Sequence, residues 1–310
     1  MTVKVYRFDD ASAPVLSASP GALIGVLSAC LVDGYGSKTG AGWTKTVGTN
    51  VAAYKQGTGG SGMSLRVDNS VSAVSYARVV GYESMTDVNT GSNAFPLESQ
   101  ITGGAYLTLS ITTDSTARPW VLVADAARFY LWVGYNVTTA TGLATTAYAP
   151  MFFFGDIVSY KPGDAFPTAI IANATSPATA NAMAAVASMG AVINGHYLSR
   201  SHTATAGAIQ FGKFIDTSTS GSVIGVGGAV YPDPVTGSFR LGRIYANAGA
   251  VAATRGHLPG LWAPLNQFVG SPGDTFSGTG ALAGRSFLLL DAASTTNRAR
   301  VALETSDTWD

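Results

Sequence analysis

Charged residues are scarce in this sequence. Of its 310 residues only 12% are Asp, Glu, Lys or Arg, the formal net charge is zero, and 46% are apolar. A soluble globular protein usually carries about 25% charged residues. Because charge repulsion keeps copies of a protein apart, a chain near zero net charge tends to associate. The composition therefore predicts a subunit whose surface is covered by other protein in a large assembly.

Cysteine and histidine are almost absent. Cys30 is the only cysteine, which excludes an internal disulfide and any cysteine-based zinc site. It lies in an apolar helical pattern, so we expect a buried and unreactive thiol. The histidines His196, His202 and His257 have no third ligand at metal-site spacing, and we interpret them as surface or loop residues. The sequence predicts no metal and no cofactor.

Long apolar runs and basic clusters are also lacking. No apolar run approaches the roughly 18 residues that would indicate a membrane span. Residues 1–5 lack the charged start and apolar stretch of a secretory leader. Basic residues are scattered along the chain, so no patch predicts binding to nucleic acid. We therefore expect synthesis in a cytoplasm, no membrane span and no nucleic-acid partner.

Aromatic residues, by contrast, are plentiful, with 13 Tyr, 13 Phe and 5 Trp. Because these side chains need burial, we expect an ordered core. The clearest helix is predicted over Pro20–Val32, with Ser19 as its N-cap and Gly34 at its end. Its apolar stripe consists of Leu23, Ile24, Leu27 and Leu31. A second, shorter helix is predicted over Ala178–Met189.

Periodic apolar segments predict strands through most of the remaining chain. Trp120–Val123 and Phe129–Val133 form a hairpin signal, and both strands are expected to be buried on two faces. The other predicted strands are 3–8, 51–54, 63–68, 75–82, 106–111, 151–160, 209–214, 239–245, 286–290 and 300–304. Short strands between glycine-rich turns favour a mainly β fold, an antiparallel sandwich or barrel with one N-terminal α-helix and a second short helix.

A soft domain boundary is expected near residues 195–205, after a stretch of small residues at 173–187. It divides the chain into a β-rich domain at 1–200, which contains the helix, and a second β-rich domain at 201–310. One continuous domain is the alternative. Strands and helices do not alternate regularly, which argues against a doubly wound α/β fold.

The best candidates for acid–base chemistry are Asp156 and Asp164, on either side of Tyr160. Glycoside hydrolysis requires two carboxylates held across a cleft. The turn at residues 162–163 favours a different role, in which Asp164 binds turn backbone and Asp156 caps a backbone group or pairs with Lys161. The sequence has no Gly-x-Ser-x-Gly elbow opening a helix and no phosphate-binding glycine loop. We therefore predict no catalytic residue.

Two tryptophans, Trp120 and Trp132, lie in predicted strands and are expected in the core. Trp262 lies instead in a proline-rich segment, 258–264, which we interpret as a rigid loop that presents an aromatic side chain. This side chain could anchor a neighbouring subunit as easily as it could bind a glycan, and tryptophan is a favoured interface anchor. The candidate interface residues are Leu258, Pro259, Leu261, Trp262 and Pro264.

Short segments of the sequence carry a resemblance to a known group of proteins; they lie at 27–36, 41–45, 65–68, 77–87, 118–120, 129–132, 155–157, 255–262 and 304–309. These segments resemble a group of poorly characterised virion structural proteins of tailed bacteriophages. The resemblance covers most of the chain and implies a component of the virus particle. It does not assign a place among tail, baseplate, collar and capsid surface.

The sequence and this resemblance together favour a non-enzymatic structural subunit of a bacteriophage virion. We expect a homo-oligomer that contacts other copies of itself and other virion proteins, made in the host cytoplasm. One alternative is a receptor- or glycan-binding module, which should carry exposed aromatic residues along a groove and bind a host-surface glycan. A polysaccharide-degrading enzyme, with two facing carboxylates, is the other.

Overall fold

The computed structural model describes residues 1–71, 74–143, 150–173, 195–214, 232, 234–235, 237–248, 253–266, 270–291 and 300–309. Within these residues, 19 strands form two antiparallel sheets, one of 13 strands and one of 6. The described part of the chain contains one α-helix, which is short. The mainly β, sandwich-like architecture predicted from the sequence is therefore confirmed. The second predicted helix, Ala178–Met189, lies outside the described residues.

The smaller sheet is a meander whose longest strand has two partners along one edge. Its strands are β2 (Thr44–Val47), β3 (Val51–Lys55), β4 (Ser64–Asp68), β5 (Tyr76–Asp87), β6 (Thr90–Phe95) and β7 (Ala105–Thr108). The first four pair in sequence order. The 12 residues of β5 pair with β7 through their first part and with β6 through their second part. Among the described strands, β2 and β6 each have a single partner.

The larger sheet runs from the N-terminal strand to the C-terminal strands in the order β1-β8-β9-β10-β12-β13-β14-β15-β16-β19-β18-β17, with β11 added on β16. Its first strands are β1 (Lys4–Arg7), β8 (Trp120–Ala124), β9 (Arg128–Val133), β10 (Met151–Asp156), β11 (Val158–Ser159), β12 (Thr168–Ile171) and β13 (His196–Leu198). The remaining strands are β14 (Ile209–Phe214), β15 (Leu241–Ala248), β16 (Ala253–Pro264), β17 (Thr275–Ser277), β18 (Ser286–Asp291) and β19 (Arg300–Glu304).

The N-terminal helix, α1 (Ala22–Ser28), continues into a π-helical turn at Ala29–Asp33. The helical segment ends at Gly34, which has a φ of 83°. Glycine adopts this positive φ without steric strain because it has no Cβ. All four residues of the predicted apolar stripe are buried, and Cys30 is buried beside them. The predicted end and buried face of the helix are thus confirmed.

The start of the helix differs from the prediction. Gly21, with φ of 79°, occupies the N-cap in place of Ser19, and no side chain of the cap residue binds the first turn. The acceptor comes from elsewhere in the chain, because Asn69 Oδ1 accepts a hydrogen bond from the Leu23 amide at 3.1 Å. The residue that follows strand β4 therefore supplies the polar group that the helix start lacks.

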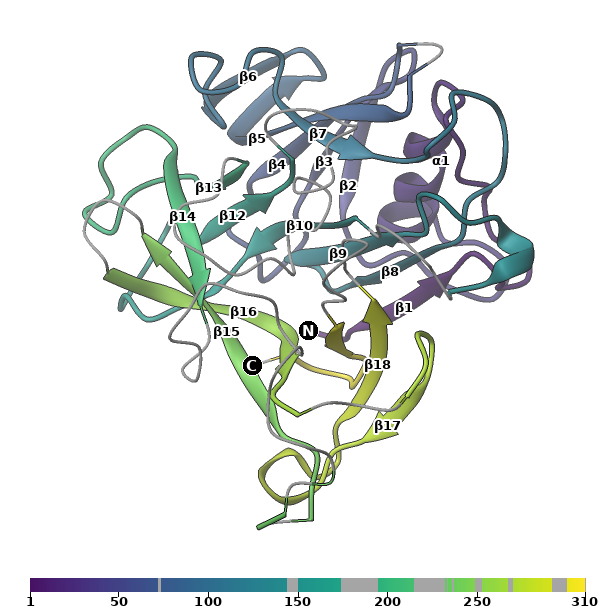
Figure 1. The fold of residues 1–310 in the computed structure, drawn as a ribbon. Coiled ribbons are helices and arrows are strands. Elements are labelled where there is room, and N and C mark those ends of the chain that lie inside the picture. The colour runs from purple at the N-terminus through teal and green to yellow at the C-terminus, as the bar shows by residue number, and fades with distance from the viewer. Residues whose placement is uncertain are drawn as a thin grey trace.

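The larger sheet folds over, so that its central strands are buried on both faces. In β9, Phe129 and Leu131 face a core shared with α1 and the smaller sheet. Tyr130 and Trp132 face a second core shared with β15, β16, β18 and β19. Figure 1 shows β8, β9 and β10 between these two layers. Strands buried on two faces appear in sequence as nearly continuous apolar runs, and the predicted hairpin of β8 and β9 is confirmed.

The segment predicted as a rigid loop, Leu258–Pro264, is the second half of strand β16. The pairing of β15 with β16 explains why this segment resembles a loop. Arg243 pairs with Trp262, but Tyr245, two residues later, pairs with His257, so β16 has more residues than β15 over this stretch. The extra residues of β16 form a bulge around Pro259 and Gly260. A proline lacks the amide proton of a regular ladder and is tolerated at such a bulge. The prolines of this segment therefore indicate a distorted strand and not a loop.

The predicted domain boundary falls between two paired strands. Across it, β13 pairs with β14 through Tyr197 with Gln210 and Leu198 with Ile209. The second core contains residues from both sides of the boundary, including Val121 and Leu303. The larger sheet therefore continues across the predicted boundary through the pairing of β13 with β14.

Candidate functional site

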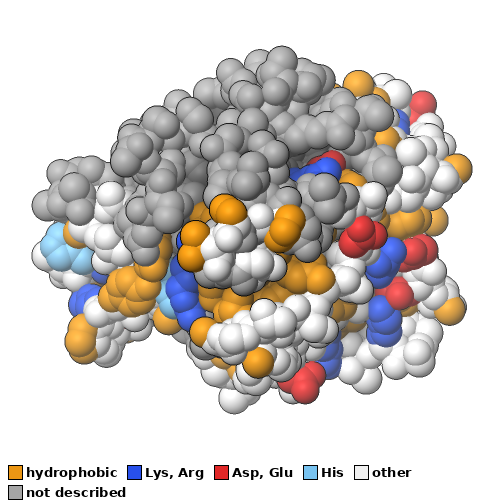
Figure 2. All heavy atoms as spheres, turned by 60° about the horizontal axis from the view of Figure 1, so that its bottom comes forward, with side chains coloured by type: hydrophobic (Ala, Val, Ile, Leu, Met, Phe, Trp, Pro, Cys, Tyr) orange, Lys and Arg blue, Asp and Glu red, His pale blue; other side chains and the backbone are white. Residues whose placement is uncertain are grey.

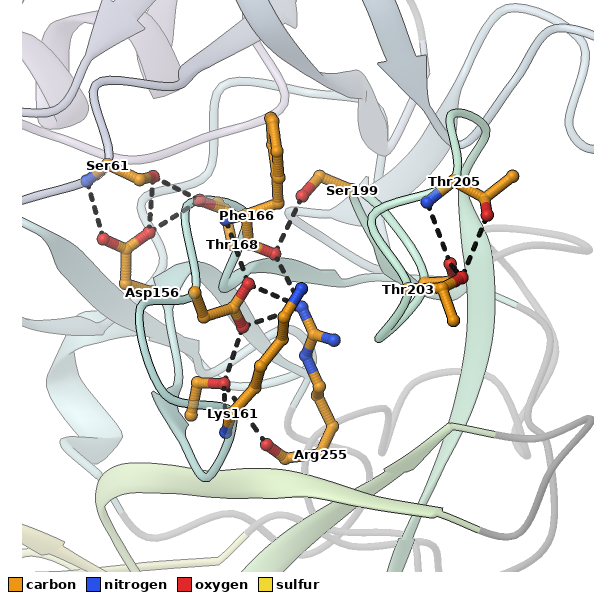
Figure 3. Close-up of polar contacts among 12 residues, drawn as sticks. Ser61, Asp156, Lys161, Phe166, Thr168, Ser199, Thr203, Thr205 and Arg255 are labelled. Atoms are coloured by element: carbon orange, nitrogen blue, oxygen red, sulfur yellow. Dashed lines mark hydrogen bonds and ion pairs between the residues drawn. The ribbon is translucent and has the colours of Figure 1, made fainter.

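The first acidic candidate, Asp156, is held by donors from two parts of the fold. It is 7% exposed at the end of β10. Its carboxylate accepts hydrogen bonds from the Ser61 amide at 2.7 Å, Gln56 Nε2 at 2.9 Å and Thr168 Oγ1 at 2.6 Å. Figure 3 shows it between Ser61 and Thr168. The expectation that Asp156 binds a backbone group is confirmed by the Ser61 amide, and the alternative, an ion pair with Lys161, is not formed. Asp156 joins the β3–β4 connection to the central strands.

The second acidic candidate, Asp164, forms a buried ion pair. Arg255 Nη2 lies 2.7 Å from Oδ2 and 2.8 Å from Oδ1. The side chains of Arg255 and Asp164 are 1% and 3% exposed, respectively. Ser159 Oγ donates to the same carboxylate at 2.6 Å, and the Phe166 amide does so at 3.1 Å. The expectation that Asp164 binds backbone near the turn is confirmed, and its main partner is an arginine that sequence reasoning missed.

The histidines are placed differently from the prediction. His196 is fully buried in β13, with its ring centroid 5.6 Å from that of Phe211. His257 is 5% exposed in β16. His202 alone of the three is exposed. The surface interpretation is therefore wrong for His196 and His257, because both fall on strands that face the interior. In the part of the chain that the structure describes, no cluster of three metal-ligating side chains occurs.

A polar chain connects β15, β16 and the turn after β11. The Tyr160 hydroxyl lies 3.1 Å from His257 Nδ1, and Arg243 Nη1 contacts His257 Nε2. A guanidinium only donates, so Nε2 accepts and the imidazole proton lies on Nδ1, where it is donated to the Tyr160 oxygen. The Tyr160 ring centroid lies 6.4 Å from that of Tyr245. Two tyrosines, a histidine and an arginine thus lie side by side in one cluster.

An open pocket of about 260 Å³ adjoins this polar chain. Its polar lining consists of Tyr160, Lys161, His202, Thr254 and Arg255, and two alanines complete it. Tyr160 is 49% exposed. No acidic residue lines the pocket among the described residues. This combination of cationic and aromatic groups suits an anionic ligand with a ring better than it suits acid–base chemistry.

The pocket had no signal in the sequence because its walls are distant along the chain. Strand β11 pairs with β16 through Val158 with His257 and Ser159 with Gly256. This pairing brings Tyr160 and Lys161 next to Arg255. Gly256 is required there, because a Cβ on it would collide with the Val158 carbonyl. A short strand with a two-residue register cannot be recognised from local periodicity.

Burial shifts the pKa of two groups outside the pocket. Desolvation raises the pKa of the Cys30 thiol well above its usual value, and the charge of Asp10 acts in the same direction. Such a thiol holds little of the reactive thiolate. Desolvation also lowers the pKa of Lys213, which is buried in β14.

The five predicted interface residues are all buried inside the chain's own fold. The indole of Trp262 is 6% exposed and donates to Glu304 Oε2 at 3.1 Å. Its ring packs edge-on against Phe287, and Arg243 lies 4.9 Å from its centroid. The expectation of an aromatic side chain presented by a loop is therefore wrong, because the chain itself covers this tryptophan.

No model of a known protein family and no curated protein matches this chain. None of the helices in the described residues has the length and apolar character needed to cross a membrane.

Proposed function

We propose that this chain is a non-enzymatic structural subunit of a bacteriophage virion, in the tail, baseplate, collar or a capsid-associated layer. It is made in the host cytoplasm and acts through contacts with other copies of itself and with other virion proteins. The observation that carries the proposal is the internal pairing of its few charges. Nine ion pairs among the described residues join nine of the 18 acidic residues to nine of the 18 basic residues.

Charge pairing favours assembly because it removes the repulsion between copies. Figure 2 shows acidic and basic side chains next to one another on one face. Wide areas of uncharged surface lie beside these charged groups. Paired charges at a surface present little net field to a second molecule. Apolar and small polar surface can then be buried between subunits at low electrostatic cost.

Free sheet edges supply a second means of contact. Strand β6 has one partner among the described strands, and its residues 90–93 are exposed. Strand β2, at the opposite edge of the smaller sheet, is also largely exposed. The unpaired backbone groups of an edge strand can hydrogen-bond a strand of another chain. These edges support assembly by strand addition.

The state of the two carboxylate candidates supports a role without catalysis. Asp156 and Asp164 accept hydrogen bonds from separate sets of donors in the protein. A glycosidase acid or nucleophile must instead face its substrate.

Sedimentation velocity of the purified chain tests the assembly proposal. We expect oligomers whose fraction rises with protein concentration and changes little with salt, because the chain has zero net charge and the proposed contacts are apolar surface and backbone hydrogen bonds. Ser92→Lys places a charge on the exposed edge strand β6 and should reduce association. Ser99→Lys adds the same charge in an exposed turn and serves as the matched control. A chain that stays monomeric at all concentrations would contradict self-assembly.

Imaging of virus particles that carry the chain tests whether the chain is a virion component and where in the particle it lies. Density for this fold should repeat in a ring or lattice, with neighbouring copies in contact. Recovery of the chain only in the soluble fraction of infected cells would contradict the proposal.

A receptor- or glycan-binding module is the second candidate. It is favoured by the exposed ring of Tyr160 in the pocket next to Tyr245, because aromatic faces stack on sugar rings and exposed aromatic side chains mark binding surfaces.

A further inference from the structure

The pocket formed by Tyr160, Lys161, His202, Thr254 and Arg255 carries an excess of positive charge. Lys161 Nζ has no hydrogen bond or ion pair with the described residues, whereas Arg255 is paired with Asp164. Lys161 and Arg255 contribute two positive charges and Asp164 one negative charge, which leaves one positive charge. Asp164 does not line the pocket. The positive end of the buried ion pair is therefore the end next to the pocket.

Arg255 has further donors that the protein does not use. Its Nη2 binds Asp164, but Nε and Nη1 are buried without a hydrogen-bond acceptor among the described residues. Buried donors are nearly always satisfied, and an exception requires an explanation. Arg255 and Lys161 both line the pocket. An anion in the pocket would meet the Lys161 ammonium and the field of a guanidinium whose charge is only partly compensated.

The remaining lining argues for a sugar over a bare ion. Tyr160 presents an aromatic ring that is 49% exposed, and the exposed Thr254 carries a hydroxyl. A volume of about 260 Å³ suits one small ring and lies near the lower end of ligand pockets. A sugar ring can stack on the tyrosine while its hydroxyls exchange hydrogen bonds with polar side chains. A carboxylate can accept a charge-assisted hydrogen bond from the Lys161 ammonium, and the buried Arg255 adds a longer-range attraction.

We propose that this pocket binds an acidic saccharide, with a sugar carboxylate at Lys161, in the field of the buried Arg255, and the sugar ring against Tyr160. The inference deepens the second candidate function and does not depend on self-association. A negative binding result would leave the sedimentation experiment unaffected, so the two proposals fail separately.

Titration of the full chain with glucuronate, glucose and inorganic phosphate tests the proposal, with binding followed by calorimetry or ligand-observed NMR. We expect saturable binding of glucuronate, at least about tenfold weaker binding of glucose, and at least about tenfold weaker binding of phosphate. Glucuronate binding should weaken as salt is added. Glucose binding as tight as glucuronate, phosphate binding as tight as glucuronate, or no saturable glucuronate binding would each overturn the proposal.

Lys161→Gln locates the site without removing the buried ion pair. It should weaken glucuronate binding about tenfold and leave the thermal midpoint unchanged. Lys55→Gln removes one charge from an exposed position at the end of β3 and should leave glucuronate binding unchanged. Tyr160→Leu should weaken both sugars by a similar factor, because it removes the stacking surface that they share. Equal affinity for glucuronate in Lys161→Gln and in the unchanged chain would overturn the assignment.

Discussion

The indole of Trp309 covers Gly260 so closely that a Cβ at position 260 would collide with it. Trp309 is held in place by a hydrogen bond from Nε1 to the Glu304 carbonyl at 2.9 Å and by an edge-on contact with Tyr130. The bulge of β16 at Pro259 and Gly260 is thus closed by a residue from the C-terminal segment.

Gly260→Ala should lower the free energy of unfolding by about 3 kcal/mol. The substitution imposes two costs, a side chain at φ of 70° and a clash with the Trp309 ring. Gly163→Ala is the matched control, because Gly163 has φ of 62° and open space where the alanine methyl group would lie. The control should cost only about 1 kcal/mol of backbone strain. Denaturant titration measures both, and equal losses would contradict the packing argument.

Leu27→Ala should cost about 2–5 kcal/mol, the range for a buried leucine. Leu27 is fully buried between α1 and the sheets. Val15→Ala, at a position that is 63% exposed, should change stability by less than about 0.5 kcal/mol. Urea titration of the two variants compares them directly, and a small loss for Leu27→Ala would mean that the helix stripe packs only after assembly.

Asp164→Asn should cost about 3–5 kcal/mol, because it leaves the buried Arg255 guanidinium without its counter-charge. The exposed Asp307→Asn should have little effect. Thermal unfolding under identical conditions gives the comparison. A loss near zero for Asp164→Asn would show that the ion pair is not maintained in solution.

Asp10 should stabilise the fold in a pH-dependent way. Burial alone would raise the pKa of its carboxyl, but hydrogen bonds from Lys38, Tyr35 and the Arg7 amide outweigh it and lower the pKa below 3.8. A lowered folded-state pKa gives stability that is complete above the unfolded-state pKa and is lost as pH falls through the folded-state value. Asp10→Asn should therefore cost about 1 kcal/mol near neutral pH, a value reduced by solvent screening, and less below about pH 4. Stability curves from about pH 2 to 7 check this, and a pH-independent difference would contradict it.

Local patterns predicted those parts of the fold that depend on neighbouring residues. The apolar runs of β8 and β9 identified strands buried on both faces, and the spacing of Leu23 and Leu27 identified the buried face of α1. Both signals arise within one element. The N-cap could not be found in this way, because its acceptor belongs to Asn69, 46 residues further along the chain and just after strand β4.

The pocket was even harder to predict from local sequence patterns than the N-cap. Tyr160 and Arg255 are 95 positions apart, and only the short pairing of β11 with β16 brings their segments together. Trp262 was misplaced because Pro259 and Gly260 carry the composition of a loop while lying in a bulged strand. Proline and glycine report where the backbone departs from regular geometry, but they do not report whether the segment leaves the sheet.

The central strands β8, β9 and β10 are shared by two hydrophobic cores. Loss of either core would expose one whole face of these strands to water, including residues such as Trp132 or Phe129, so neither layer can melt while the other stays intact. Unfolding should therefore be a single cooperative transition, and its calorimetric and van't Hoff enthalpies should agree. A mutation in α1 would then weaken the distant C-terminal strands as much as the helix itself. The layered sheet is therefore expected to make the described fold one thermodynamic unit, in which damage at one end is felt at the other.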